Sequence, residues 1–177
     1  EEQICLLRIS SMKAFIFDEA EKIEEYLAQA QLIAGHSKTP LNHLMISAIQ
    51  AMHLFQVGEY KKAYEIANIN CSQFSRLNYV GSFAPLDSLF VMARCLLEFA
   101  RQREAKAKFA QVSALAEKWG EWSWYFMAEG YLARELAVNG EVAEALEAVK
   151  LAHQKVSEID FSHELNAIID LSELFIR

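Results

Sequence analysis

One helix–turn–helix segment near the end of the sequence limits the folds open to this chain more than any other feature. In the stretch 132–152 (LARELAVNGEVAEALEAVKLA), apolar residues recur three and four apart up to Val138, and Asn139-Gly140 then interrupts the pattern. A second amphipathic segment follows at once and keeps the same spacing. Such recurrence is the period of an α-helix, and Asn-Gly is a strong turn signal. The segment therefore predicts two antiparallel helices joined by a tight turn.

The rest of the sequence predicts the same kind of structure. No segment combines sustained two-residue alternation with turn signals, so we expect an all-α fold without strands. Thr39-Pro40 marks one helix start, because proline is favoured at the first helical position. We predict about nine helices in a single domain, 1–177. They form four pairs and one terminal helix, at about 1–35, 40–77, 85–118, 121–158 and 161–176.

The pairs also resemble one another in sequence. The second helix of each pair carries an alanine in similar surroundings, at Ala20, Ala63, Ala107 and Ala145, with intervals of 43, 44 and 38 residues. In two copies a glycine stands five residues earlier, whereas Phe15 and Gln102 take that place in the others. A period of this size predicts stacked helix pairs, each of which buries its apolar face against its neighbours.

The spacing of glycine and alanine at Gly58–Ala63 and Gly140–Ala152 resembles the tetratricopeptide repeat. The resemblance implies a right-handed superhelix of antiparallel helix pairs, whose first helices line a concave, ligand-binding face. The usual repeat is about 34 residues long, which is shorter than every interval here. Most copies also lack the aromatic residue that opens that repeat and the proline that closes it.

The longer, looser pairs look more like the helical sensor region of MalT-like, LuxR-type bacterial transcription regulators. In that family an ATPase module precedes the helical array and a helix-turn-helix domain follows it. The chain contains neither a GxxxxGK[ST] motif nor a basic recognition helix, and it begins without Met inside a helical pattern. The resemblance therefore implies an effector-sensing or partner-binding fragment of a longer regulator.

Composition limits the partners and the chemistry. The net charge of −7 disfavours direct contact with nucleic acid, and no secretory signal or apolar run of membrane-spanning length is present. The three cysteines lie in apolar helical runs, which is typical of buried residues in a reducing, cytoplasmic protein. The five histidines show no metal-ligand spacing, and no nucleophile stands with a base. We expect no catalysis, metal or cofactor.

The methionines suggest one candidate binding surface. All five lie on the first helices of pairs and fall on one helical stripe when they are counted from the repeat alanines. On the concave face, this stripe would form an apolar groove for a peptide, a partner helix or a small effector. The alternative is that the stripe is core, which we favour because an amphipathic stripe normally points inward. Polar residues off the stripe, including Asn42 and Asp87, would then face water. The groove residues would be Met45, Met52, Phe55, Met92, Phe99, Met127 and Arg134.

A second candidate surface is the aromatic cluster at 119–126 (WGEWSWYF). Bulky residues this close together cannot all face one side of a helix, so we expect one or two of them, such as Trp122 and Tyr125, to be exposed. They would form either a ligand platform or a packing contact, between repeats or with a neighbouring domain, and packing is the commoner role.

The sequence therefore predicts a non-catalytic interaction or effector-sensing module of a bacterial transcription regulator. Its partner would be a protein, a peptide or a small effector. A passive scaffold or self-associating segment, and a peptide-pheromone receptor of the same architecture, remain as alternatives.

Overall fold

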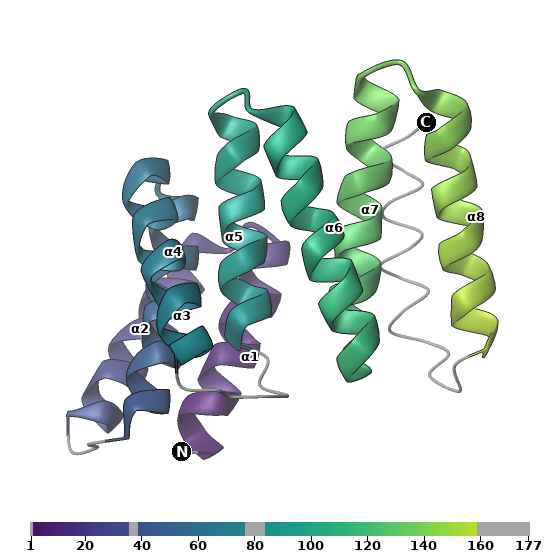
Figure 1. Cartoon of the computed structure of the whole chain (residues 1–177). Coiled ribbons are helices and arrows are strands. Elements are labelled where there is room, and N and C mark those ends of the chain that lie inside the picture. Colours follow the sequence, from purple (N-terminus) through teal and green to yellow (C-terminus); the bar gives the residue numbers. More distant parts are fainter. Residues whose placement is uncertain (1, 36–38, 77–83, 159–177) are drawn as a thin grey trace. The chain divides into compact units, whose positions relative to one another are not determined.

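The computed structural model describes residues 2–35, 39–76 and 84–158, and all of the regular structure in these ranges is helical (Figure 1). The helices are α1 (Glu2–Ile16), α2 (Ala20–Ala34), α3 (Pro40–Gln56), α4 (Tyr60–Arg76), α5 (Ala84–Glu98), α6 (Gln102–Trp119), α7 (Trp122–Val138) and α8 (Val142–Glu158). The outer bounds of the four pairs that they form lie within one residue of those predicted. The predicted terminal helix 161–176 lies outside the described residues.

The chain divides into two compact units. Unit 1 runs from Glu1 to Ala100 and contains α1 to α5; unit 2 starts at Arg101 and contains α6 to α8. The boundary thus separates α5 and α6, which the sequence predicts to be one helix pair. The prediction of a single domain remains a prediction.

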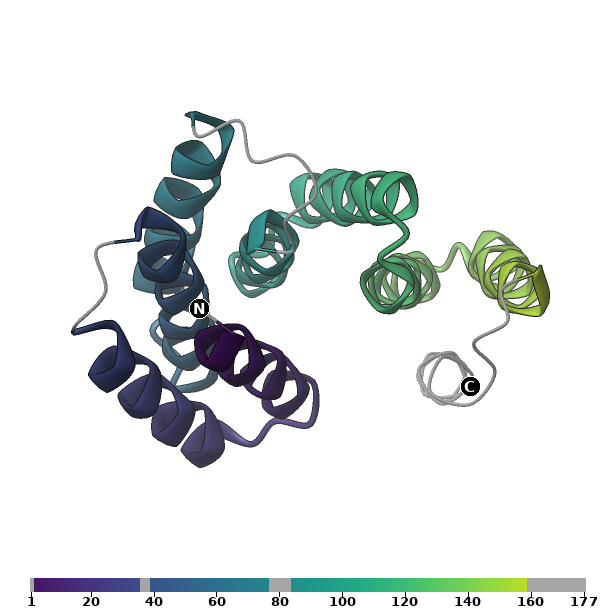
Figure 2. The same ribbon diagram turned by 90° about the horizontal axis from the view of Figure 1, so that it is seen from below.

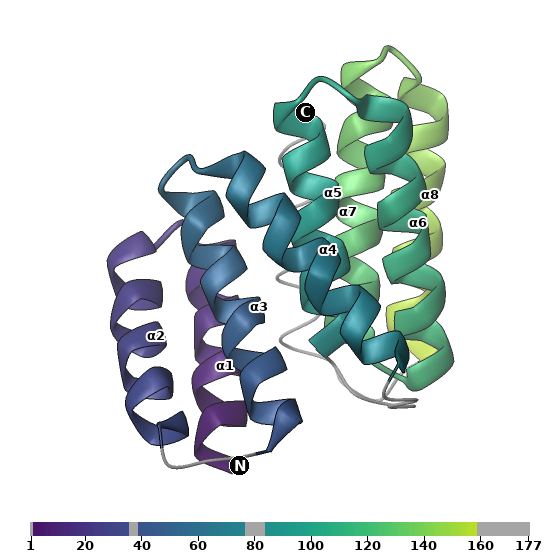
Figure 3. The same cartoon turned by 60° about the vertical axis from the view of Figure 1, so that its left-hand side comes forward.

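Within unit 1, α1, α2 and α3 pack against one another, and α4 packs against both α3 and α5 (Figure 3). The first helices of the pairs also meet, because α3 contacts α1 and α5. Within unit 2, α7 lies between α6 and α8 (Figure 1). Each element therefore buries its apolar side against its neighbours in the chain, as expected of stacked helix pairs.

The same turn joins the two helices of every pair. One residue in each turn has a left-handed backbone, with φ of 60° at Asp18, 82° at Gly58, 56° at Ala100 and 84° at Gly140. Glycine adopts this conformation without steric cost, whereas aspartate and alanine do not. In three of the turns, the next amide bonds a carbonyl five residues earlier: Glu19 N to Ala14 O (2.9 Å), Glu59 N to Leu54 O (2.8 Å) and Glu141 N to Leu136 O (2.9 Å).

Counting from this turn residue gives the true alignment of the repeat. The residue five positions later is fully buried in all four copies, as Ile23, Ala63, Ala105 and Ala145. The residue twelve positions later is also buried, as Ala30, Asn70, Val112 and Ala152. The alignment predicted from sequence was correct for the second and fourth copies. It was wrong for the first, where it chose Ala20, and for the third, where it chose the exposed Ala107.

Candidate partner-binding surfaces

The methionines of the predicted groove are core residues. Met45 is 5%, Met52 0%, Met92 2% and Met127 4% exposed, and Phe55 is buried with them. A ligand has no access to these side chains unless the helices separate. The groove interpretation required them to be accessible, so the structure supports the alternative that the stripe is core.

In unit 1 the first helices of the pairs are α1, α3 and α5. Side chains of α1 and α5 meet directly and fill the face that these three helices share. Figure 2 shows both helices on the same side of α3. Phe15 of α1 lies with its ring centroid 5.4 Å from that of Phe55 and 6.5 Å from that of Phe90. The guanidinium carbon of Arg94 lies 4.9 Å from the Phe15 centroid and 4.4 Å from the Phe55 centroid. The chain's own aromatic side chains thus occupy the place predicted for a ligand.

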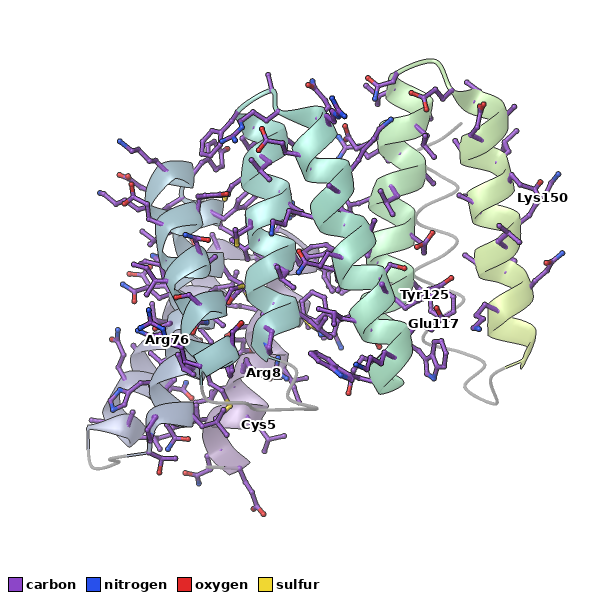
Figure 4. All side chains as sticks on the ribbon, in the orientation of Figure 1. Cys5, Arg8, Arg76, Glu117, Tyr125 and Lys150 are labelled. Atoms are coloured by element: carbon purple, nitrogen blue, oxygen red, sulfur yellow. The ribbon has the colours of Figure 1, made fainter. Side chains whose placement is uncertain are left out.

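A buried ion pair completes this closure. Arg8 of α1 donates from Nη1 to Asp87 Oδ1 at 2.8 Å and to Asp87 Oδ2 at 2.6 Å, and both side chains are buried (Figure 4 labels Arg8). Burial, the largest single effect, lowers the pKa of Arg8, but Asp87 and Cys5 together raise that pKa by more. The guanidinium therefore stays charged, and the pair ties together two helices that are far apart in sequence.

Two polar residues expected to face water are instead inside unit 1. Asn42 and Asp87 are both buried. Asp87 is buried because Arg8 supplies the opposite charge, a partner that the spacing of residues on α5 alone does not reveal. Beside it, Asn70 of α4 donates from Nδ2 to Leu44 O (3.0 Å) and to Ser88 Oγ (2.9 Å). The first turn of α5 is therefore a buried polar junction between α1, α3 and α4.

Two residues predicted for the groove do reach the surface. Phe99 is 37% exposed, and its ring packs against that of Tyr64 with centroids 6.2 Å apart. Arg134 on α7 is exposed. Phe99 belongs to unit 1 and Arg134 to unit 2.

The aromatic cluster in unit 2 divides between buried and half-buried residues, whereas the sequence predicts that one or two are exposed. Trp124 and Phe126 are buried, whereas Trp122 and Tyr125 are half-buried. Trp122 and Tyr125 pack against the buried cluster formed by Phe126, Ala133, Val149 and Ala152. Their rings meet edge to face, with centroids 5.9 Å apart. One side of each ring thus packs inside the unit while the rest remains accessible.

Charged groups from the two neighbouring helices surround this aromatic pair. Lys155 of α8 places Nζ 5.5 Å from the Trp122 ring centroid, and the same Nζ lies 2.9 Å from Oε1 of Glu117 on α6. Glu117 and Tyr125 lie close together on adjacent helices (Figure 4). We call Glu117, Trp122, Tyr125, Glu129 and Lys155 the aromatic–acidic patch.

The carboxylates of the patch change the acidity of its members. Burial, helped by the charges of Glu129 and Glu117, raises the pKa of Tyr125 to about 12, so its hydroxyl stays protonated. Burial also raises the pKa of Glu129, and Glu117 adds to the rise. Ser113 opposes it by donating from Oγ to Glu129 Oε1 at 2.5 Å. The patch therefore offers a hydroxyl donor, two aromatic rings and acidic oxygens.

The amino-acid sequence indicates only the aromatic half of this patch. Glu117 and Lys155 are 38 positions apart in the chain, and each is one of many charged residues on its helix. Only the packing of α6 and α8 against α7 brings them to Trp122. Consecutive aromatic residues gave the one signal that sequence could offer.

Other kinds of site are not evident in the part of the chain that the structure describes. No group of three or more His, Cys, Asp and Glu side chains there is arranged to hold a metal ion. None of the described helices is long and apolar enough to cross a membrane. Cys95 is buried, and burial raises the pKa of its thiol to about 12, which makes it a poor nucleophile.

Known proteins resemble this chain in fold. No protein-family model matches it, and no curated protein does. Among solved structures it is similar to a putative kinesin light chain from Podosopora anserina with nearly identical TPR-like repeats, at a TM-score of 0.60 and 20% identity. A variant of that protein matches with a TM-score of 0.61 and 21% identity. Each match covers 99% of this chain and 82% of the other. The chain therefore has the all-α fold of tetratricopeptide-like helical repeats.

Proposed function

We propose that this chain is a non-catalytic protein-interaction module and that its partner binds the aromatic–acidic patch of unit 2. Similar repeats stack helix pairs into binding surfaces, which supports the general role. Since the methionine stripe is core and α1 fills the shared face of unit 1, the partner must use another surface. Of the residues predicted from sequence, Trp122 and Tyr125 are the two that lie together and remain accessible.

The observation that carries this proposal is the position of Lys155 over Trp122 and beside Glu117. The chain itself shows that this place accepts a cation, because an ammonium group already lies above the ring and near a carboxylate. A partner's arginine or lysine would therefore compete with Lys155 for the Glu117 carboxylate and the Trp122 ring. Tryptophan and tyrosine are also enriched among residues that dominate binding energy. The partner segment that fits is basic, with an apolar residue beside the cation.

Selection of displayed random peptides on the full chain tests the proposal. We expect enrichment of peptides that contain arginine or lysine beside an apolar residue. Trp122→Ala and Tyr125→Ala should each weaken a selected peptide at least about tenfold, a typical loss at such positions. Phe17→Ser, which removes an exposed aromatic residue of unit 1, is the matched control and should leave affinity unchanged.

A second variant tests the role assigned to the resident lysine. Lys155→Ala removes the competing cation and should tighten binding of a basic peptide, whereas Glu117→Gln should weaken it. Circular dichroism on each variant separates a binding effect from loss of fold. Selection of peptides without basic residues, or affinities that Trp122→Ala leaves unchanged, would exclude the patch as the binding site.

The finer predictions from the sequence remain predictions. They include the effector-sensing role in a MalT-like regulator, a cytoplasmic location, a small effector, self-association and the peptide-pheromone receptor. The sequence of the complete polypeptide tests the regulator interpretation, which requires a phosphate-binding motif before the helical array and a helix-turn-helix domain after it.

A further inference from the structure

Helix α1 carries an exposed apolar pair between two opposite charges. Leu6 is 63% and Ile9 45% exposed, and Glu2 and Lys13 on the same side of the helix are exposed as well. The four residues are four, three and four positions apart, so they form one stripe along the helix. We call Glu2, Leu6, Ile9 and Lys13 the α1 outer face.

The opposite side of α1 supplies its packing within unit 1. Ile4, Arg8, Ser11 and Phe15 are buried there, and α1 packs against both α2 and α3. The α1 outer face is turned away from this interior. Exposed aliphatic side chains that lie together inside a polar rim are typical of a surface that binds a partner.

The α1 outer face is complementary to itself when a second copy lies antiparallel to it. Leu6 of one copy then faces Ile9 of the other, and Glu2 faces Lys13, because both pairs are centred on the same point of the helix. A twofold axis at that point repeats each contact, as in an isologous interface. The alternating spacing of four and three residues is also that of a coiled-coil seam.

Charge selects this orientation over the parallel one. Parallel helices would place Glu2 against Glu2 and Lys13 against Lys13, and like charges brought together oppose binding. The residues that flank the α1 outer face on its two sides are uncharged, so they add no repulsion to the antiparallel arrangement. These residues are Gln3, Cys5, Ser10 and Met12.

We propose that the α1 outer face is a homodimer interface, occupied by the same face of a second copy of this chain in antiparallel orientation. Leu6 and Ile9 supply the apolar contact, and the two Glu2–Lys13 pairs fix the orientation. Association is weak and depends on protein concentration, because the interface is small. This inference goes beyond the proposed function, whose peptide-binding patch lies in the other unit.

Reversal of the charges at the two ends of the face tests the antiparallel pairing. Glu2→Lys places a lysine against Lys13 of the second copy, and Lys13→Glu places a glutamate against Glu2. Each variant alone should associate at least about tenfold more weakly than the parent, because two attractive contacts become repulsive. An equimolar mixture of the two variants restores both ion pairs and should regain the parent's affinity. Sedimentation equilibrium from about 10 μM to about 1 mM measures all four samples, since small interfaces associate in this range.

The mixture separates the interface from effects within one chain. Glu2 and Lys13 both suit the dipole of α1, so each reversal can also lower the stability of that helix. Mixing two folded chains leaves such internal effects unchanged. Recovery of the dimer in the mixture therefore requires that the two outer faces meet, and circular dichroism confirms that each variant is folded.

Substitution of the apolar pair provides a second, independent test. Leu6→Lys with Ile9→Lys removes the apolar contact and should leave a monomer at every concentration. Leu32→Lys is the matched control, because Leu32 on α2 is 77% exposed and lies outside the α1 outer face. It should leave the dimer unchanged.

Three results would overturn the proposal. A parent chain that stays monomeric over the whole range would leave the face to a partner of another kind. A dimer that survives the double lysine substitution would be joined through another surface. A mixture that associates no better than its two components would exclude the antiparallel pairing. Peptide binding at Trp122 is a separate readout, so failure here leaves the proposed function untouched.

Discussion

The two units bury their ionisable groups in different ways. Unit 1 encloses both members of an ion pair, in which Arg8 Nη1 donates to both carboxylate oxygens of Asp87. Unit 2 keeps a partly buried carboxylate, Glu129, whose hydrogen bond comes from the neutral hydroxyl of Ser113. The pair in unit 1 fixes α1 against α5, whereas the carboxylate in unit 2 remains at the edge of an accessible patch. The same repeat thus gives a closed unit and an open one, depending on a few polar side chains.

Removal of one charge from the pair should have the largest effect. Asp87→Ala leaves the Arg8 guanidinium buried without its partner, and we expect a loss of about 3–5 kcal/mol in unfolding free energy. Urea denaturation followed by circular dichroism measures it. The double variant Arg8→Met, Asp87→Leu replaces both charges by apolar groups of similar volume and should recover most of the loss. A loss below about 1 kcal/mol in Asp87→Ala would show that the pair is not buried as described.

Substitution of the residue twelve positions after the turn residue, Asn70 in unit 1 and Ala152 in unit 2, compares the interiors of the two units directly. Asn70→Ala in unit 1 removes two hydrogen bonds and leaves Ser88 Oγ and Leu44 O without the amide, so we expect a loss of about 1–3 kcal/mol. The loss is limited because Asn70 Oδ1 itself has no partner among the described residues. Ala152→Asn in unit 2 introduces an amide where the neighbours are apolar and should also destabilise. Equal stability of both variants and the parent would remove the distinction between the interiors.

The backbone turn, by contrast, should behave alike in both units. At Gly58 and Gly140 no atom lies within 4 Å of an added Cβ, so alanine there costs only left-handed strain, about 1 kcal/mol. Ala100 already has this strain, and Ala100→Gly should stabilise by up to about 1 kcal/mol. Thermal unfolding measures all three. Unequal losses of stability for Gly58→Ala and Gly140→Ala would mean that the two turns differ in more than the identity of the left-handed residue.

These turns also explain how much of the fold the sequence predicts. The helices were predictable because their apolar spacing is regular, and Gly58 and Gly140 marked two turns correctly. At Asp18 and Ala100 the left-handed residue is not glycine, so nothing in the pattern marked it. Helix α6 added to the difficulty, since alanines at 105, 107, 110, 114 and 116 occur around much of its circumference. Ala107 resembled the repeat alanine in its surroundings, but packing buries Ala105.

The candidate patch was predictable only in part, for a related reason. Crowding of aromatic residues at the start of α7 requires that some face outward, and this predicted Trp122 and Tyr125. Local sequence says nothing of Lys155 and Glu117, which meet through tertiary packing. The methionine stripe shows the same limit. Counting from Ala20, Ala63, Ala107 and Ala145 placed all its members on one face, but counting from the turn residues leaves Met92 off the positions that the other methionines share. In unit 1 the contact of α1 with α5, which this spacing does not reveal, closes the face.

The smallest expected effect is a pH dependence of unit 2 that arises from Glu129. Its pKa is higher in the folded protein than its ordinary value, mainly because of burial. The folded state therefore binds more protons than the unfolded state over that range, and its stability falls as pH rises through the folded pKa. Glu129→Gln keeps an oxygen for the Ser113 hydroxyl but removes the charge. At neutral pH it should stabilise by less than about 1 kcal/mol, within the usual range for a partly exposed position.

Urea midpoints of the parent and Glu129→Gln, measured from pH 4 to pH 7, test this expectation. The two proteins should be nearly equal at the acid end and diverge as pH rises. Ser113→Ala removes the hydrogen bond that holds the Glu129 pKa down, so it should make the parent's pH dependence steeper, and the double variant should abolish the added slope. Divergence in the opposite direction would mean that the carboxylate is stabilised in the folded state. Both units would then compensate their buried charges equally well, and the contrast between a closed unit and an open one would rest on shape alone.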